Sequence, residues 1–173
     1  MALRHEKSKM AGNSAPVART EGGLHINSDT GLCTDYLNHF SEAVMLLEML
    51  PVVPESIDDF LAWQPSSYRE HFASSNFKNR DAVIAAYQSS DPALRNTLDA
   101  IADSMNVMLT ATREALKAKT TPAAANKLAD CAVSWVRPLV TRAGMLINGS
   151  LAANARKPEP GATQSAVDAL FRN

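Results

Sequence analysis

Apolar residues recur every three or four positions between Asp91 and Lys119, and this is the clearest helical pattern in the chain. Asp91 is a favoured N-cap residue and Pro92 suits the first helical position, so the helix should begin there. A polar row with the same spacing runs beside the apolar row, and we expect it to meet water or a partner while the apolar row packs. The apolar row is Leu94, Leu98, Ile101, Met105, Met108, Thr112 and Leu116, and the polar row is Asp99, Asp103, Asn106, Thr110 and Arg113.

A second helical pattern covers residues 34–50, where Thr34 is a suitable cap. Its apolar positions cover more than half of the helix surface, so most of this helix should be buried. The remaining edge is polar. The apolar positions are Leu37, Phe40, Ala43, Val44, Leu46, Leu47 and Leu50, and the polar edge is Asp35, Asn38 and Glu42.

Short helices are expected between residues 51 and 90. Pro51 and Pro54 end the preceding helix. Two Ser-x-x-acid pairs with capping-box spacing predict helices over 57–63 and 67–74, with a further helix over 81–88. The pairs are Ser56 with Asp59 and Ser67 with Glu70, and the aromatic residues expected to close the bundle over this corner are Trp63, Tyr68 and Phe72.

The last long pattern, over 123–153, begins after the turn at 120–122. Pro138 lies inside it, so we expect a kink or two abutting helices. The expected core row is Leu128, Cys131, Ala132, Trp135, Val136, Leu139, Leu146, Ile147 and Leu151. Two long segments joined by a short turn favour an antiparallel helical hairpin, against which the 34–50 helix packs. The fold class is therefore all-α, a hairpin within a four-helix-like bundle.

Composition divides the chain into four parts. Residues 1–30 have few large apolar groups, which predicts a disordered N-terminal tail. Residues 31–155 form the helical bundle domain. The two prolines of the 156–162 segment indicate an extended linker. Residues 163–173 form a short amphipathic sequence with Val167, Leu170 and Phe171 on one face, typical of a peptide that docks as a helix in a groove.

Charge and composition exclude several classes of function. Residues 31–118 hold twelve acidic and six basic side chains, whereas residues 120–157 hold five basic and one acidic. The acidic middle would repel phosphates, so nucleic-acid binding is not expected. With 46 % hydrophobic but only 6 % aromatic residues, the chain suits one helical domain rather than a sheet.

Targeting signals and metal motifs are also not expected. No run approaches the roughly 18 apolar residues of a membrane span, and the first 30 residues lack a secretion signal, so we place the protein in the cytoplasm without a membrane partner. Cys33 and Cys131 stand alone and should be buried thiols. The Glu-x-x-His pairs of a di-iron bundle are missing, so no metal site is expected.

A resemblance suggests a function. The run from Thr163 to Phe171 matches a short peptide, roughly Ser-Gln-x-x-Val/Ile-Asp-x-Leu-Leu/Phe, with which the CheZ chemotaxis phosphatases and the FliM flagellar switch proteins bind the response regulator CheY. As in CheZ, it follows a proline-containing linker behind a helical hairpin. The resemblance implies that the apolar residues fill the regulator's groove while polar ones set the register. Those residues would be Gln164, Val167, Asp168, Leu170 and Phe171.

The same resemblance implies a reaction for the bundle. CheZ-type phosphatases speed hydrolysis of an aspartyl phosphate with an amide that orients water and an acid one turn away, and the Mg²⁺ ion belongs to the regulator, so the phosphatase itself needs no cofactor. The usual Asp-x-x-x-Gln and Glu-x-x-Asn pairs do not occur here. Two Asp-x-x-Asn pairs do, with both groups on one helix face. They are Asp35 with Asn38 and Asp103 with Asn106.

Three hypotheses stay open. The chain is a CheZ-like phosphatase, a non-catalytic adaptor for the same regulator, or a helical interaction protein unrelated to chemotaxis. In the third case the protein could form a homodimer through an apolar face, and the tail would pack on its own bundle. A solvated polar stripe or an interhelical hydrogen bond is the ordinary role for each Asp-x-x-Asn pair. The sequence favours Asp35 and Asn38 slightly, because Glu42 extends their polar row.

Overall fold

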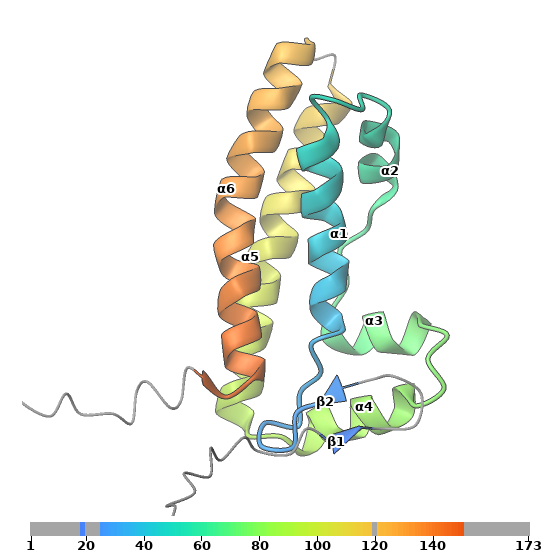
Figure 1. Ribbon diagram of the computed structural model, residues 1–173, viewed down its shortest axis with the longest axis vertical. Helices are drawn as coiled ribbons and strands as arrows, with labels where there is room; N and C mark the ends of the chain where they lie inside the picture. Colours follow the sequence, from blue (N-terminus) through green and yellow to red (C-terminus); the bar gives the residue numbers. More distant parts are fainter. Residues whose placement is uncertain (1–17, 20–24, 119–120, 151–173) are drawn as a thin grey trace, which may run out of the picture.

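The computed structural model describes residues 18–19, 25–118 and 121–150 of the chain. This part is all-α apart from a small antiparallel ribbon in which β1 (Ala18–Arg19) pairs with β2 (His25–Ile26). Three long helices run side by side, and shorter helices lie at both ends of the long ones (Figure 1). The helices are α1 (Tyr36–Met49), α2 (Ser56–Ala62), α3 (Tyr68–Ser74), α4 (Arg80–Ser89), α5 (Pro92–Lys117) and α6 (Pro122–Ile147).

The α5–α6 hairpin forms as predicted, with 26 residues in each helix. The carboxylate of Asp91 accepts a hydrogen bond from the Ala93 amide at 2.7 Å, and Thr121 caps α6 in the same way through the Ala124 amide. Each helix has a proline in its first turn, where no intrahelical hydrogen bond is lost. These local signals explain why both helix starts could be predicted from sequence.

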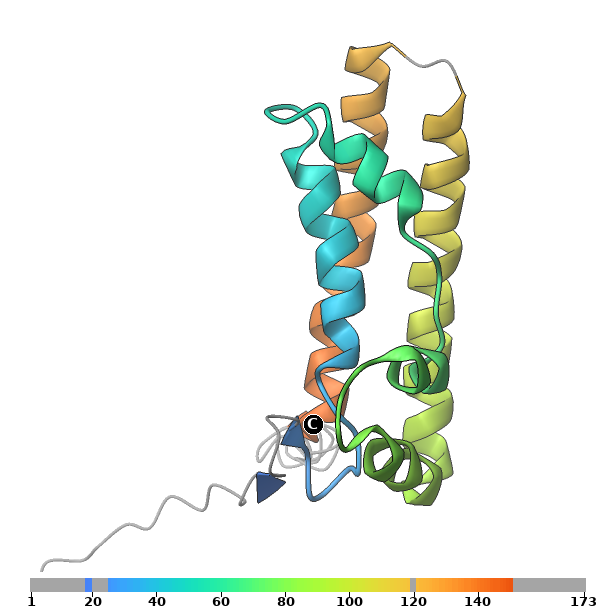
Figure 2. The same ribbon diagram turned by 90° about the vertical axis from the view of Figure 1, so that its right-hand side faces the viewer.

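The bundle resembles a four-helix bundle in which α1, α5 and α6 are three of the helices and an interrupted segment takes the place of the fourth. The α1 helix packs along α6, while α2 packs against both α1 and α5 (Figure 2). The chain then runs down from α2 through residues 63–67 to α3 and α4 at the lower end. The expected four-helix-like bundle is thus confirmed, with α2, the 63–67 segment and α3 together taking the place of one long helix.

The core follows the predicted rows of α1 and α5 closely. In α1 the buried side chains include Leu37, Phe40 and Leu47, and only Leu46 of the expected set is half-buried. In α5 the expected Leu98, Met105 and others are buried. Three residues outside the expected α5 row are buried as well: Ala102, Leu109 and Arg113. The aromatic corner is also confirmed, because Trp63, Tyr68 and Phe72 are all buried.

The expected core row of α6 is confirmed in part, because Ala132, Val136, Leu146 and Ile147 are buried. Cys131 and Trp135 were also predicted to be buried, but both are exposed, and Trp135 keeps 62 % of its surface. The helix packs against both α1 and α5, and four of its seven buried residues are alanines. The buried residues are Ala125, Ala129, Ala132, Val136, Ala143, Leu146 and Ile147, with Leu128 and Leu139 half-buried beside them. Leu151 lies outside the described residues.

Two further expectations about helices are corrected. Ser56 does not cap α2; its hydroxyl donates to the Leu46 carbonyl at 3.0 Å, so it ties α2 to α1 instead. Of the two outcomes expected at Pro138, two abutting helices are not observed, because α6 continues from Pro122 to Ile147 as one helix. The proline side chain is exposed.

The N-terminal tail was predicted to extend to residue 30, but residues 25–30 pack on the lower end of the bundle. Thr30 is buried, and its hydroxyl donates to the Ile147 carbonyl at 2.6 Å. Asn27 accepts hydrogen bonds from the amides of Asp29 and Thr30. Small polar residues are ordered here by side-chain-to-backbone bonds, which carry no hydrophobic periodicity.

Candidate functional site

The Asp35–Asn38 pair lies at the start of α1. Asn38 is exposed, whereas Asp35 is half-buried and accepts a hydrogen bond from the Cys33 thiol at 3.0 Å. Burial, together with the hydrogen bond to Asp35 and the charge of its carboxylate, raises the pKa of Cys33 to about 12. The thiol is therefore a protonated donor at neutral pH. Glu42, the next member of this row, is exposed one turn along the helix.

The Asp103–Asn106 pair lies in the middle of α5 and is partly occupied by internal contacts. The Asn106 amide nitrogen donates to the Ser66 carbonyl at 3.2 Å, and its oxygen is buried without a hydrogen-bond partner among the described residues. Asp103 is exposed and lines a small polar hollow of about 260 Å³ with Tyr36, Arg69 and Asp99. Because its amide oxygen is buried, Asn106 could accept a hydrogen bond from an attacking water only if solvent reached this atom.

The polar row of α5 has a different role from the one we expected. The Tyr87 hydroxyl contacts both carboxylate oxygens of Asp99, at 2.8 and 2.7 Å. Arg113 is buried and donates to the Trp63 carbonyl at 2.6 Å. Much of this row therefore holds the 63–87 segment onto α5 instead of facing water or a partner.

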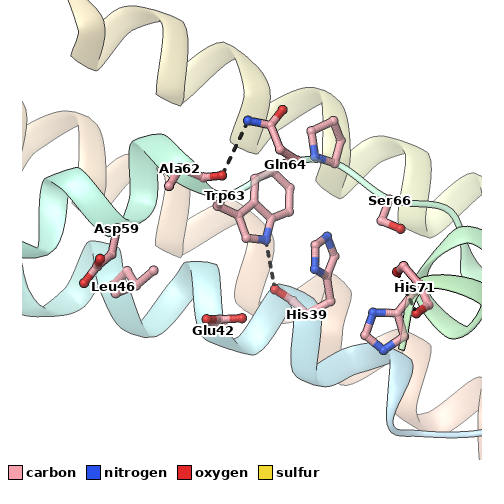
Figure 3. Close-up of a pocket in the computed structure, with 11 residues that line it drawn as sticks. His39, Glu42, Leu46, Asp59, Ala62, Trp63, Gln64, Ser66 and His71 are labelled. Carbon is pink, nitrogen blue, oxygen red and sulfur yellow. Dashed lines mark hydrogen bonds between the residues drawn. The ribbon is translucent and has the colours of Figure 1, made fainter. Parts of the chain in front are cut away.

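The structure also forms a hollow that the sequence analysis did not find. It has a volume of about 770 Å³ and lies between α1, α2 and α3 (Figure 3). At its centre the rings of His39 and Trp63 stack at 4.8 Å, and the His71 ring lies 5.7 Å from His39. The Trp63 indole N–H donates to the His39 carbonyl at 3.1 Å. The acidic side chains of Glu42 and Asp59 complete one side of the hollow.

Both histidines of this hollow are neutral at neutral pH. Burial and, to a smaller extent, the positive charge of a protonated His71 lower the pKa of His39 to about 4. Burial also lowers the pKa of His71, although the Asp35 carboxylate opposes that shift. The His39 Nε2 atom is buried and has no hydrogen-bond partner in the described part of the chain. His71 is half-buried and lines the hollow, so it can exchange hydrogen bonds with a ligand, whereas the buried Nε2 atom of His39 cannot. The two rings are not a nucleophile and base in contact.

Sequence signals could not have found this hollow. His39 and Glu42 are one turn apart on α1, but His71 comes from α3, more than 30 residues later. Only the path of the 63–67 segment brings the two histidines together. Among the described residues, no three histidine, cysteine or acidic side chains cluster in a way that would hold a metal ion.

The predicted docking residues Gln164, Val167, Asp168, Leu170 and Phe171 lie outside the described residues, as does the 156–162 linker.

Within the described ranges, no helix combines the length and apolar character needed to cross a bilayer. Comparison of the chain with family models, with curated proteins and with solved structures gives no match.

Proposed function

We propose that this protein binds a phosphorylated CheY-like response regulator in the cytoplasm through residues 163–171. The observation that carries the proposal is the run of Gln164, Val167, Asp168, Leu170 and Phe171, whose residue types and spacing match the regulator-binding peptide. The described part of the chain supports it, because α6, which packs in the bundle, ends at Ile147, ahead of the proline-containing stretch. A peptide attached in this way holds a bound regulator close to the bundle surface.

We further propose that Asn38 orients the water that attacks the regulator's aspartyl phosphate, with Asp35 as the neighbouring acid. Such hydrolysis needs positioning more than covalent chemistry, so one exposed amide on a rigid helix is sufficient. Asn38 suits this role better than Asn106, because its side chain is exposed while that of Asn106 is bonded to Ser66. The Mg²⁺ ion that the reaction requires would be bound by the regulator.

A non-catalytic adaptor is the second candidate. It is favoured by the hydrogen bond between Cys33 and Asp35, which occupies one carboxylate oxygen of the proposed acid. Asp and Asn side chains are also shorter than the Glu and Gln found at such sites. Under this hypothesis the peptide recruits the regulator, and the bundle either blocks one of the regulator's surfaces or presents that surface to another protein.

The test is the lifetime of the acyl phosphate on purified CheY-like regulators, measured with and without the full-length protein. The phosphatase proposal expects the lifetime to shorten at least tenfold and the effect to be lost in Asn38→Ala. Asn96→Ala is the matched control, because Asn96 is an exposed asparagine on another helix. Phe171→Ser should weaken regulator binding at least tenfold, since it removes a large apolar anchor.

Each proposal has a result that contradicts it. If the regulator binds and its phosphate lifetime is unchanged, the adaptor is correct and the phosphatase is wrong. If Asn38→Ala retains full activity, another group orients the water. If the regulator does not bind the full-length protein, the match at 163–171 arose by chance, and an unrelated helical interaction protein, including a homodimer, becomes the better hypothesis.

A further inference from the structure

One face of α6 is apolar, exposed and not covered by the rest of the bundle. Trp135 is 62 % exposed, and it lies one turn from exposed Cys131 and Pro138. The half-buried Leu128 and Leu139 flank these residues at helical spacing. Four of these residues, Leu128, Cys131, Trp135 and Leu139, were expected in the core. We refer to residues 128, 131, 135, 138, 139 and 142 as the outer face of α6.

An exposed tryptophan in such a row is typical of a binding surface. Indole rings that are buried on binding contribute a large share of interface energy, and they are uncommon on free surfaces. Arg142 continues the row and has no acidic partner among the described residues. The face therefore suits an amphipathic helix that carries a carboxylate beside its apolar residues.

The 163–173 segment of the same chain has this chemistry. When it is drawn as a helix, Val167, Leu170 and Phe171 form one apolar face with Asp168 at its edge. An antiparallel alignment with α6 that places Asp168 opposite Arg142 places Phe171 opposite Leu139, one turn from Trp135. The charged pair and the contact of Phe171 with Leu139 are therefore satisfied in a single register.

The chain is long enough for this contact. Twelve residues, 151–162, separate the described helix region from the segment, and they reach up to about 40 Å when extended. The distance along α6 from Ile147 to Trp135 is twelve residues, or about 18 Å. The linker can therefore reverse direction and place the segment along the outer face.

We propose that residues 163–173 dock on the outer face of α6 when no regulator is bound. Since the apolar residues used for this contact are those proposed to bind the regulator, the two contacts exclude each other. The contact with α6 does not depend on the proposed function. The inhibition of regulator binding by this contact does rest on the proposed function. Docking in this way places Phe171 beside Trp135 and keeps the peptide from other partners until a regulator competes for it.

Native Cys131 allows the contact to be measured in the full-length protein. Cys131 is exposed on the outer face and Cys33 is buried, so a nitroxide spin label attaches selectively at Cys131. We expect the amide NMR signals of residues 166–172 to broaden with the oxidised label and to recover on its reduction. If these signals are as sharp with the oxidised label as with the reduced one, the segment does not dock on α6 and the proposal is overturned.

Variants of the segment separate docking from chance encounters. Phe171→Ser should remove the broadening, whereas Ala169→Ser, on the opposite side of the helix, should leave it unchanged. Quenching of Trp135 fluorescence by acrylamide gives a second readout without the label, and Phe171→Ser should raise the quenching constant at least twofold. Equal quenching in the two variants would overturn the proposal.

A mixing experiment tests whether the contact is within one molecule. Isotope-labelled protein without nitroxide is mixed with spin-labelled protein at natural isotope abundance. Sharp signals from the segment support the proposal. Broadened signals mean that the segment docks on a second copy, which overturns the intramolecular contact in favour of a dimer.

Regulator affinity tests the inhibitory effect. Removing the docking face should tighten regulator binding, by about tenfold if the segment is docked nine-tenths of the time. We expect this from Trp135→Ser but not from Val107→Ser, because Val107 is equally exposed but lies on α5. Unchanged affinity in Trp135→Ser would overturn inhibition. If the segment signals broaden but no regulator binds, docking on α6 is supported and the proposed function is wrong. If a regulator binds but the signals do not broaden, the proposed function is supported and docking on α6 is refuted.

Discussion

His39 shows how burial changes the chemistry of a single side chain. Its ring stacks on Trp63 at 4.8 Å and faces His71, so water has little access to its Nε2 atom. A charged imidazolium is poorly solvated in this position, and the fold therefore favours the neutral form. The same argument applies to His71, whose pKa is also lowered by burial.

These two histidines should make stability depend on pH. The pKa of His39 is about 4 in the fold and 6.5 in an unfolded chain, so between these values the unfolded chain binds a proton that the folded chain does not. The contribution of the neutral ring is complete above pH 6.5 and is lost as the pH falls toward 4. Urea unfolding at several pH values should show the free energy of unfolding decreasing through this window.

A double variant tests this assignment. His39→Gln with His71→Gln should flatten the pH dependence between pH 6.5 and 4, because glutamine does not titrate there. His25→Gln replaces an exposed histidine and should leave the curve unchanged. A double variant with the wild-type pH dependence would show that other groups dominate in this range.

At the scale of helices, capping explains why a helix as short as α3 forms. The Ser67 hydroxyl accepts from the Glu70 amide at 3.3 Å, and the Glu70 carboxylate accepts from the Ser67 amide at 2.9 Å. These bonds satisfy backbone donors that a seven-residue helix would otherwise leave unpaired. The position of α3 matters for the histidine hollow, because this helix carries His71.

Removing the cap should weaken this end of the bundle. Ser67→Ala is expected to lower the free energy of unfolding by about 1 kcal/mol, measured by urea denaturation. Ser104→Ala is the control, because Ser104 is an exposed serine inside α5 whose hydroxyl bonds only to its own helix. We expect the control to change stability by less than about 0.5 kcal/mol. Equal effects of the two substitutions would contradict the capping role.

At the scale of the whole molecule, the N-terminal segment joins the two ends of the described chain. Thr30 donates to the Ile147 carbonyl at the end of α6 and is buried there. Gly31 follows with a φ of +70°, and a Cβ at this position would lie 3.1 Å from the Ala86 carbonyl oxygen on α4. One short stretch therefore contacts both α6 and α4, which are far apart in sequence.

Loss of the Thr30 hydroxyl should loosen this junction. Thr30→Val keeps the shape of the side chain but leaves the Ile147 carbonyl without its donor, which is expected to cost about 1–3 kcal/mol of unfolding free energy. Thr97→Val, in which an exposed threonine on α5 loses its hydroxyl, should cost less than about 0.5 kcal/mol. Hydrogen exchange should quicken in residues 25–33 and in the last turn of α6 together. Faster exchange in only one of the two would contradict the junction.

Local rules in the sequence determined where the helices form. Asp91 and Thr121 cap the hairpin helices, Ser67 caps α3, and the 3.6-residue period of α1 identifies its buried face. These features depend on residues within one or two turns of each other, so they need no knowledge of the fold. The match of residues 163–171 to a regulator-binding peptide is also a local pattern of residue types and spacing, and its function stays a prediction.

Tertiary structure alone decided which apolar residues of α6 are buried. The expected row joined residues that are buried, such as Val136 and Ile147, with Trp135, which is exposed, and the packing of α6 against α1 and α5 separates them. It also decided that Asn106 and Arg113 bind the 63–67 segment and that His39 meets His71. Such choices depend on distances between helices remote in sequence, for which the period of a single helix carries no information.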